Sequence, residues 1–371
     1  MKKTFYIYGA GIVATSIYTA IKKLYNRRPI AFLVSEKEGN PFEIDGIPVL
    51  KLEEVGNIDA DAKYLIATSV THHDVIADGL CQIGVAREQL ILADNRLENK
   101  LMEEYYLGLS EFLTVQEMLQ CDGNSRNVSV ALDDSKQVES LHDIVVYQAK
   151  CHVDKPLNNP VTIPDYICPI QVGAVFTDKV IADVRDNLGD NISYKNRNYC
   201  ELTGTYYAWK NSRTSYKGLC HYRRVFDISE EQLQTLINRY EDVDVILPYP
   251  SVHYPDISGQ HKRYINEDDW NAMLMAMKEV APEYYEAYIK DVSKQRYFYN
   301  YNMLIAKNEV FDDYCNFLFT VLEKTEELTV PKGWERADRF AGYLGENLTT
   351  IYFRKNRDKL KIVHAGKVWL T

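Results

Sequence analysis

The sequence predicts an α/β protein of two folded units, and three observations support this prediction. The first residues read as a strand, a glycine turn and a helix. Short β-rich runs then alternate with helical stretches over most of the chain, as in sheets covered by helices. Finally, 371 residues exceed one typical hydrophobic core, so two domains are expected.

The N-terminal unit, residues 1–95, is predicted to be a small Rossmann-like domain. A strand at 5–8 leads into the turn Gly9-Ala10-Gly11, and apolar residues at helical spacing follow over 14–24. Further segments continue the same alternation. Strands are expected at 30–34, 46–50, 64–68 and 89–92, and a helix at 74–83. This order is typical of a doubly wound sheet.

The turn at Gly9 and Gly11 resembles the dinucleotide fingerprint, in which glycines let the backbone approach a pyrophosphate. These two residues are therefore candidate nucleotide contacts. The second strand should end in an acid that binds the ribose, but Ser35 stands there and Glu36 comes one residue late. NAD is thus disfavoured, and the alternative is a regulatory, scaffold or oligomerisation unit.

The middle of the chain, residues 96–140, is predicted to be a helical connection, with amphipathic helices over 101–119 and a polar break at 120–125. The second domain is expected to span 141–371 and to alternate strands with helices. Strands are expected at 144–149, 166–171, 217–222, 243–247 and 301–306, and helices at 198–210, 267–280, 309–323 and 338–353.

Composition excludes several classes of protein. The net charge of −10 argues against a nucleic-acid partner. Seven scattered cysteines, none in a Cys-x-x-Cys pair, predict reduced thiols and a cytoplasmic location. No segment reaches the ~20 apolar residues of a membrane span. The 28 tyrosines suit a carbohydrate-binding cleft, although coding bias explains them equally well.

One polar segment of the second domain carries an acid on a helical face that is otherwise suited to burial. Glu201, Thr205 and Trp209 recur at helical spacing. A buried acid needs a partner, so Glu201 is either a catalytic group that meets a ligand hydroxyl or half of a structural ion pair.

A second segment is the strand that ends in His221-Tyr222-Arg223-Arg224. Ligands bind at the carboxyl ends of strands in α/β sheets, and a guanidinium suits a diphosphate. Because neighbouring strand residues face opposite sides, one arginine is expected to bind phosphate and the other to pair with an acid such as Glu201. The alternative is a solvated surface pair.

The third segment precedes a helix and contains His261, Asp268 and Asp269. Either aspartate is a candidate base for an acceptor hydroxyl. The alternative is that Asn266 caps the helix and that the acids stabilise its first turn.

Several blocks of the second domain together resemble a bacterial family of glycosyltransferase-like proteins long catalogued only as a domain of unknown function. The resemblance spans about residues 143–355. The blocks are Glu201-Leu202-Thr203-Gly204-x-Tyr206-x-x-Trp209-Lys210-Asn211, Gly218-Leu219-Cys220-His221-Tyr222-Arg223-Arg224, Val245-Ile246-Leu247-Pro248, Asn302-Met303-x-Ile305, Phe311-Asp312-x-Tyr314-Cys315 and Gly342-Tyr343-Leu344-x-Glu346-x-Leu348.

This resemblance implies an A-type glycosyltransferase sheet and a transferase that uses a nucleotide sugar in the assembly of capsular or other surface glycans. The first functional hypothesis is the transfer of a hexose from a UDP-sugar to a glycan hydroxyl, with inversion. Some members are similar to galactofuranosyltransferases. It implies a lipid-linked or oligosaccharide acceptor at the inner face of the membrane, with peripheral membrane contact and homo-oligomerisation as further expectations. The metal-binding Asp-x-Asp of such enzymes is not at the expected strand end, because Asp242-Val243-Asp244 precedes its strand. Arginines are expected to neutralise the leaving diphosphate instead, which leaves a divalent metal an open question.

The predicted site residues fall into three groups. The candidate catalytic groups are Asp268, Asp269, Glu201 and His221. The candidate donor contacts are Arg223, Arg224, Tyr222, Asn191, Lys195 and Tyr147. The candidate acceptor contacts are His261, Trp209, Asn302 and Glu346. Two other functions remain open: an NAD-dependent dehydrogenase or epimerase of nucleotide sugars that uses the glycine turn, and a non-catalytic subunit of glycan assembly.

Overall fold

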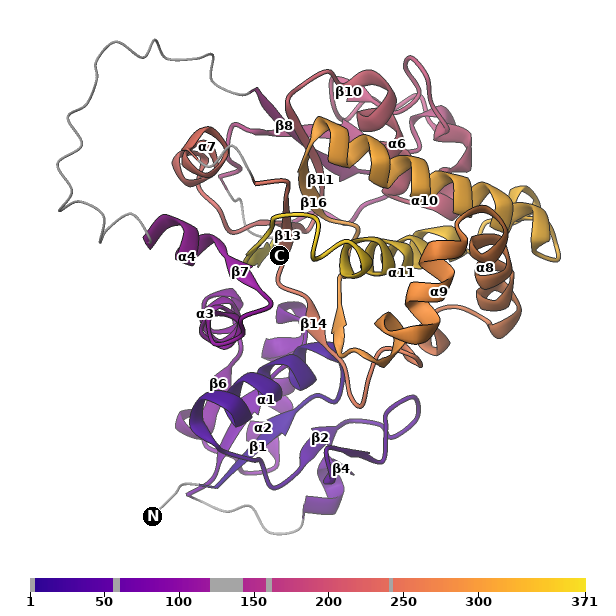
Figure 1. Ribbon diagram of the computed structural model, residues 1–371. Helices are drawn as coiled ribbons and strands as arrows, with labels where there is room; N and C mark the ends of the chain where they lie inside the picture. The colour runs from indigo at the N-terminus through magenta and orange to yellow at the C-terminus, as the bar shows by residue number, and fades with distance from the viewer. Residues whose placement is uncertain (1–3, 56–60, 121–142, 158–161, 240–242) are drawn as a thin grey trace, which may run out of the picture.

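The computed structural model describes residues 4–55, 61–120, 143–157, 162–239 and 243–371. They form two large sheets with helices packed against them, one near each end of the molecule, and a separate two-stranded ribbon (Figure 1). The predicted α/β class is therefore confirmed. The predicted boundary near residue 140 and the polar break after residue 120 lie outside the described residues.

The first sheet has six strands in the order β3-β4-β2-β1-β5-β6. These are β1 (Phe5–Tyr8), β2 (Phe32–Val34), β3 (Glu43–Ile44), β4 (Ile47–Lys51), β5 (Lys63–Ile66) and β6 (Leu90–Leu92). All neighbours are parallel except β3 and β4. The chain moves from β1 to one side and later returns to the other side through β5, so the β1–β5 border is the switch point at which ligands bind in such sheets.

Helices cover both faces of the first sheet, and its central strands β1 and β2 are therefore buried on both sides. On one face, α1 (Ile12–Tyr25) and α3 (Asn95–Leu107) pack against the side chains around Ile7. On the other, α2 (His73–Gln82) packs against those around Tyr6. The predicted strands and helices of this unit agree with the observed ones to within about two residues.

The second sheet follows the path β10-β9-β8-β11-β16-β13-β17-β7, with β12 and β18 attached beside β11. Its strands are β7 (Leu113–Thr114), β8 (Ile144–Lys150), β9 (Ile167–Gln171), β10 (Val184–Arg185), β11 (Tyr216–His221), β12 (Arg224–Phe226), β13 (Val245–Pro248), β16 (Leu304–Lys307), β17 (Ile362–Ala365) and β18 (Lys367–Trp369). Along the path only β16 is antiparallel to its neighbours. The switch point of this sheet lies between β8 and β11.

The helices of the second sheet divide by face. One face carries α5 (Asn196–Tyr199), α6 (Leu202–Asn211), α8 (Glu267–Val280), α9 (Pro282–Lys290), α10 (Asn308–Leu328) and α11 (Phe340–Lys355). The other carries α4 (Val115–Gln120) and α7 (Glu230–Arg239). No helix within the described ranges is both long and apolar enough to cross a membrane.

The helices predicted over 101–119 begin earlier in the structure, at Asn95, and β7 separates α3 from α4. Two predicted elements of the second domain also differ from the structure. The helix expected at 198–210 is divided into α5 and α6, because Cys200 adopts a positive φ of 52° between them. The strand expected to end in both arginines stops at His221 instead. Tyr222 and Arg223 form a two-residue turn, and Arg224 opens β12 opposite His221. The two arginines therefore do not lie on opposite faces of one strand.

Short contacts join the two sheets. The small ribbon of β14 (Ser251–Val252) and β15 (Tyr297–Phe298) reaches α1, where the Val252 N–H donates to Ser16 Oγ over 2.8 Å. Helix α3 holds the C-terminal strand β18: Asn95 Nδ2 donates to the Trp369 carbonyl, and Lys367 pairs with Glu98 over 2.8 Å. These contacts place the glycine turn of the first sheet opposite the second sheet.

Candidate active site between the two sheets

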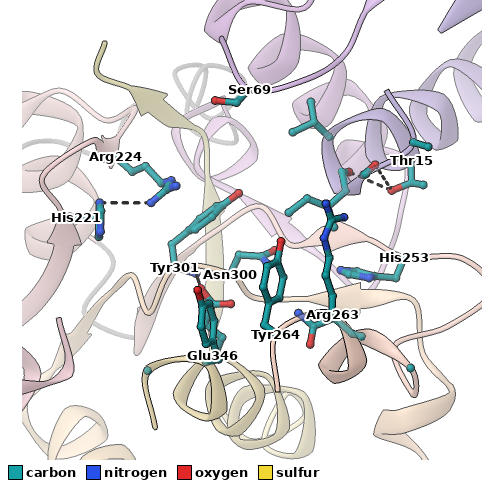
Figure 2. A pocket seen from close by; sticks show the side chains of 18 of the residues that line it. Thr15, Ser69, His221, Arg224, His253, Arg263, Tyr264, Asn300, Tyr301 and Glu346 are labelled. Carbon is teal, nitrogen blue, oxygen red and sulfur yellow. Dashed lines mark hydrogen bonds between the residues drawn. The ribbon is translucent and has the colours of Figure 1, made fainter. Parts of the chain in front are cut away.

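Two cavities meet where the switch point of the first sheet faces the carboxyl edge of the second. The first cavity, of about 590 Å³, has a wall from the Gly11 turn and Ser69 and another wall from β11, β18 and α11 (Figure 2). The second cavity, of about 450 Å³, lies at the carboxyl ends of β8, β9 and β11. The residues that line both cavities are Cys200, Glu201, His221 and Arg339.

Glu346 supplies a carboxylate to the first cavity from the second turn of α11. Its Oε1 accepts a hydrogen bond of 2.8 Å from the Tyr301 N–H. Burial, reinforced by the nearby Glu201 carboxylate, nevertheless raises the pKa of Glu346 to about 7. Such a group exchanges a proton readily near neutral pH, as a general base must.

Glu201 lies immediately before α6. The loop that contains Tyr301 and Asn302 holds this acid as well as Glu346. Asn302 donates its side-chain amide to Glu201 Oε1 over 2.8 Å and to the Gly342 carbonyl over 3.2 Å. Burial raises the pKa of the Glu201 carboxyl. The two acids are therefore neighbours that resist simultaneous ionisation.

The backbone around these acids has positive φ angles at four residues that are not glycine. The φ angles are 52° at Cys200, 76° at Tyr301, 49° at Asn302 and 67° at Arg339. Each such residue costs roughly 1–2 kcal/mol relative to an ordinary conformation. Strain of this kind is typical of functional sites, where it aims groups that regular elements would not.

Arg224 projects from β12 into the first cavity, and two rings hold it. Its guanidinium carbon lies 4.1 Å from the centre of the Tyr301 ring and 4.0 Å from that of Trp369. Its Nη1 is 3.3 Å from His221 Nδ1, and among the described residues no carboxylate lies within ion-pair distance. A planar cation fixed in this way is suited to bind an anionic group of a ligand.

His221 is neutral at physiological pH. Burial and the charges of Arg224, Arg339 and Arg223 lower the pKa of its imidazole to about 3. The Arg223 N–H and Arg224 Nη1 both approach Nδ1, at 3.4 and 3.3 Å. An Nδ1 that accepts leaves the proton on Nε2, so His221 can donate a hydrogen bond but does not serve as a base.

Arg339 lies at the junction of the two cavities, where it precedes α11. Its Nε donates to Cys200 Sγ over 3.2 Å. Burial, with the nearby Glu201, raises the pKa of that thiol to about 12, so the sulfur is protonated and the arginine keeps its charge for a ligand. In the part of the chain that the structure describes, Arg339 has no carboxylate within ion-pair distance.

Asp186 organises the far wall of the second cavity from a fully buried position. Its carboxylate accepts from the backbone N–H groups of Gly173 and Ala174 and from the hydroxyls of Ser193 and Thr203, over 2.6–3.0 Å. These donors belong to the turn after β9, the short helix before α5, and α6. One acid thereby joins three segments around the cavity.

Comparison with known proteins identifies the second half of the chain. Residues 151–357, more than half of the sequence, match the family described as Domain of unknown function (DUF4422). The chain belongs to the DUF4422 family. No curated protein matches it.

A solved structure titled WbbM bifunctional glycosyltransferase, in its apo form, is similar to this DUF4422 protein. The identity is 25%, the TM-score is 0.53, and the likeness covers 62% of this chain and 45% of that one. The protein thus spans less than half the length of WbbM. The similarity supports the α/β fold expected from the sequence and its likeness to glycosyltransferases.

The structure brings together part of the predicted site. Glu201, His221, Arg224 and Glu346 line the first cavity. Tyr222 lines the second cavity, and Gly11 lies on the far wall of the first. Asn302 is buried behind Glu201 and positions it. Gly9 supports the turn, because its φ of 118° and a backbone oxygen 2.6 Å from any added Cβ exclude other residues.

The two candidate bases Asp268 and Asp269 line neither cavity, which corrects their predicted role. They lie in the first turn of α8, where Asn266 accepts from the Asp269 N–H over 2.8 Å. Asp269 also forms a bidentate ion pair with Arg336 at 2.5 and 2.6 Å. These contacts support the helix-capping alternative.

The other predicted ligand contacts are used by the fold and line neither cavity. His261 stacks on Trp270 at 4.1 Å, and Trp209 stacks on Phe319 at 5.7 Å. Lys195 pairs with the buried Glu326, Asn191 closes a turn onto Gly189, and Tyr147 packs edge-on against Tyr207. Arg223 lies in the hairpin turn over Tyr222.

Within the described residues, no group of three or more His, Cys, Asp or Glu side chains is arranged to hold a metal ion. Asp244 lies at the amino end of β13 and pairs with Lys307 at 3.4 Å, while Asp242 falls outside the described residues. Arginines also line the two cavities: Arg224 and Arg263 line the first, Arg197 lines the second, and Arg339 lines both.

The residues of the site that sequence reasoning missed include Cys200, Tyr301, Arg339, Trp369 and Arg263. Arg339 stands alone in a polar stretch, and Trp369 lies almost at the end of the chain, so neither forms a local pattern. Their proximity arises only when β18 pairs with β12 and α11 packs against α5.

Proposed function

We propose that the protein is a glycosyltransferase in which Glu346 is the general base and the arginines at the cavity junction stabilise the leaving diphosphate. The observation that carries the proposal is the position of Glu346. A carboxyl group with a pKa of about 7 faces a cavity that is also lined by Arg224 and Arg339, and neither cation has a carboxylate within ion-pair distance among the described residues. The likeness to a structure titled as a glycosyltransferase supports the same chemistry.

The nucleoside diphosphate of the donor is assigned to the second cavity, because ligands of open α/β sheets bind at the carboxyl ends of strands beside a switch point. The β8 and β11 ends meet there, and Arg197 and Arg339 line the space. The anomeric carbon then lies toward the junction at His221, and the acceptor enters from the first cavity.

In the proposed reaction, the Glu346 carboxylate takes the proton of an acceptor hydroxyl while that oxygen bonds to the anomeric carbon. The bond from this carbon to the diphosphate oxygen breaks, and the diphosphate leaves with the electron pair. Arg339, which lines both cavities, and Arg224, whose Nη1 lies 3.3 Å from the junction residue His221, offset its growing negative charge. His221 Nε2–H donates a hydrogen bond. Attack from the face opposite the leaving group inverts the anomeric configuration.

The donor is proposed to be a UDP-hexose, and UDP-galactofuranose is the first candidate because of the resemblance to galactofuranosyltransferases. The residues at the end of β2 count against the alternative of an NAD-dependent enzyme, because an acid that binds the ribose is expected there. Glu36, the nearest acid, pairs with Lys51 at 2.6 Å, and Ser35 bonds to the Tyr8 hydroxyl at 2.7 Å. Neither lines a cavity.

The test is release of nucleoside diphosphate from a panel of nucleotide sugars, with and without EDTA. We expect release from a UDP-hexose, its loss in Glu346→Gln, and its persistence in Asp268→Asn, which alters an acid outside both cavities. Release that survives in Glu346→Gln would rule out the assigned base. Glycan binding without release from any donor would favour the non-catalytic alternative.

A further inference from the structure

Helix α3 of the first unit holds strand β18 of the second sheet through two asparagines that lie one turn apart. Asn95 Nδ2 donates to the Trp369 carbonyl over 3.0 Å, and the Trp369 N–H donates to Asn95 Oδ1 over 2.9 Å. Asn99 repeats this pair of hydrogen bonds with the carbonyl and the N–H of Lys367, over 2.9 and 3.2 Å. Residues four apart on a helix are separated by about 6 Å along its axis, and alternate residues of a strand by about 6.6 Å, so the two spacings match. The two amides therefore pair with β18 as a neighbouring strand would.

These hydrogen bonds use the edge of β18 that faces away from its own sheet. On the other edge β18 pairs with β12, and the Leu370 N–H donates to the Arg223 carbonyl over 2.8 Å. Because the backbone groups of successive strand residues point to opposite edges, those of Lys367 and Trp369 point toward α3. An edge strand would otherwise present these groups unpaired. Helix α3 thus fixes the position of β18 from the side opposite β12.

The position of β18 matters to the site because the strand carries Trp369, one of the two rings that hold Arg224. Trp369 is the β18 residue opposite Arg224, and its ring centre lies 4.0 Å from the guanidinium carbon. The Trp369 ring also meets the Tyr301 ring, the second contact of Arg224, edge-on at 5.6 Å. Arg224 Nε is buried and has no hydrogen-bond partner among the described residues. The orientation of the guanidinium therefore depends more on the two rings than on hydrogen bonds.

We propose that Asn95 is a positioning residue for Arg224 and that the first unit, through α3, completes the transfer site. The inference rests on the proposed function, in which Arg224 offsets the charge of the leaving diphosphate. The segment that matches the family, residues 151–357, contains Arg224 but neither Asn95 nor Trp369. The first unit thereby has a role in transfer that requires no nucleotide at its glycine turn.

The variant that tests the proposal is Asn95→Ala, which removes both hydrogen bonds to Trp369 and changes no residue that lines the two cavities. Ser16→Ala is the matched control. It also removes a side-chain hydrogen bond between the two sheets, to the Val252 N–H over 2.8 Å, but at β14 instead of β18. If Asn95→Ala does not fold, Asn95→Asp replaces it. The aspartate lies in the first turn of α3, where an acid is favourable, and it loses only the donor to the Trp369 carbonyl.

The first measurement is a double-mutant cycle in kcat/KM for diphosphate release. We expect Asn95→Ala to lower kcat/KM about 10- to 100-fold when Arg224 is present, because a misplacement of about 1 Å costs up to that much. When Arg224 is replaced by lysine, the same change should cost less than about threefold, since the two residues act through one contact. Equal losses in both backgrounds, or an equal loss in Ser16→Ala, would overturn the proposal.

The second measurement does not depend on transfer. Aromatic rings shift the magnetic resonance of nearby protons, so the Arg224 Nε–H signal, assigned by its loss in Arg224→Lys, should be displaced from those of exposed arginines. We expect this signal to move toward the exposed position in Asn95→Ala and to stay unchanged in Ser16→Ala. An unchanged signal in Asn95→Ala would refute the positioning role. A lack of diphosphate release from every donor would contradict the proposed function alone, so the two failures are distinguishable.

Discussion

The backbone N–H of Tyr301 donates a hydrogen bond to Glu346 Oε1 over 2.8 Å, from a residue held at a φ of 76°. The next residue, Asn302, holds Glu201 in the same way with its side chain. One strained turn before β16 therefore positions both acids of the site. Burial raises the pKa of Glu346 to about 7, and the Tyr301 N–H, which favours the carboxylate, offsets only part of that rise.

Glu346→Gln should lower kcat by about 10²–10⁴-fold with little change in donor binding, because it removes the base and keeps the shape. In the wild type, the base must be deprotonated. With a pKa of about 7 for Glu346, kcat should rise with pH up to about 7 and then level off. Glu283→Gln, at an exposed glutamate outside the site, is the control. A flat wild-type profile between pH 5 and 8 would contradict this role.

Arg224 and Arg223 are adjacent in sequence but differ in expected effect. Arg224→Lys keeps the charge and loses the planar group between Tyr301 and Trp369, so kcat/KM should fall about 10²-fold, as for loss of a group that stabilises developing charge. Arg223→Lys should change it by less than about threefold, because Arg223 lies in the hairpin turn and lines neither cavity. Steady-state kinetics on both variants, with melting temperatures as a check on folding, test this difference. Equal losses would refute it.

Much of the fold follows from the sequence, because strands and helices with strong periodicity are specified locally. β1, α1, α8 and α11 lie within about two residues of their expected positions. The site is less predictable. Asp269 and Lys195 were expected to bind ligands from their polar surroundings, yet their partners Arg336 and Glu326 lie far away in the sequence.

The position of Arg224 in the site could not be predicted from the sequence either. The sequence places Arg224 near the end of a strand but does not reveal that the chain reverses at Tyr222 and Arg223. That reversal moves Arg224 onto β12, where pairing with β18 brings Trp369 against it. Such contacts depend on sheet register, which a single sequence does not specify.

Asp186→Asn should destabilise the protein without removing any group that lines a cavity. The substitution replaces one of the two carboxylate oxygens of Asp186 by an amide NH2 group, which then faces the N–H and O–H donors of the network. Breaking a buried network in this way should lower the free energy of unfolding by about 3–5 kcal/mol. Urea denaturation measures the loss. The exposed Asp183→Asn, on the approach to β10, is the matched control and should stay within about 0.5 kcal/mol of the wild type.

His221 should remain neutral, protonated on Nε2, well below the pH at which ordinary histidines titrate. Its pKa of about 3 in the folded protein lies below the usual value near 6.5, so between these values only the unfolded chain binds the proton. Unfolding then takes up a proton, and the free energy of unfolding falls as the pH is lowered through this window, by up to about 1.4 kcal/mol per pH unit. His221→Gln removes this pH-dependent loss of stability. As the pH is lowered from about 6.5 toward 3, the free energy of unfolding should therefore fall less in the variant than in the wild type. Nitrogen chemical shifts of the ring report the tautomer directly, and a doubly protonated ring at pH 6 would exclude the assignment.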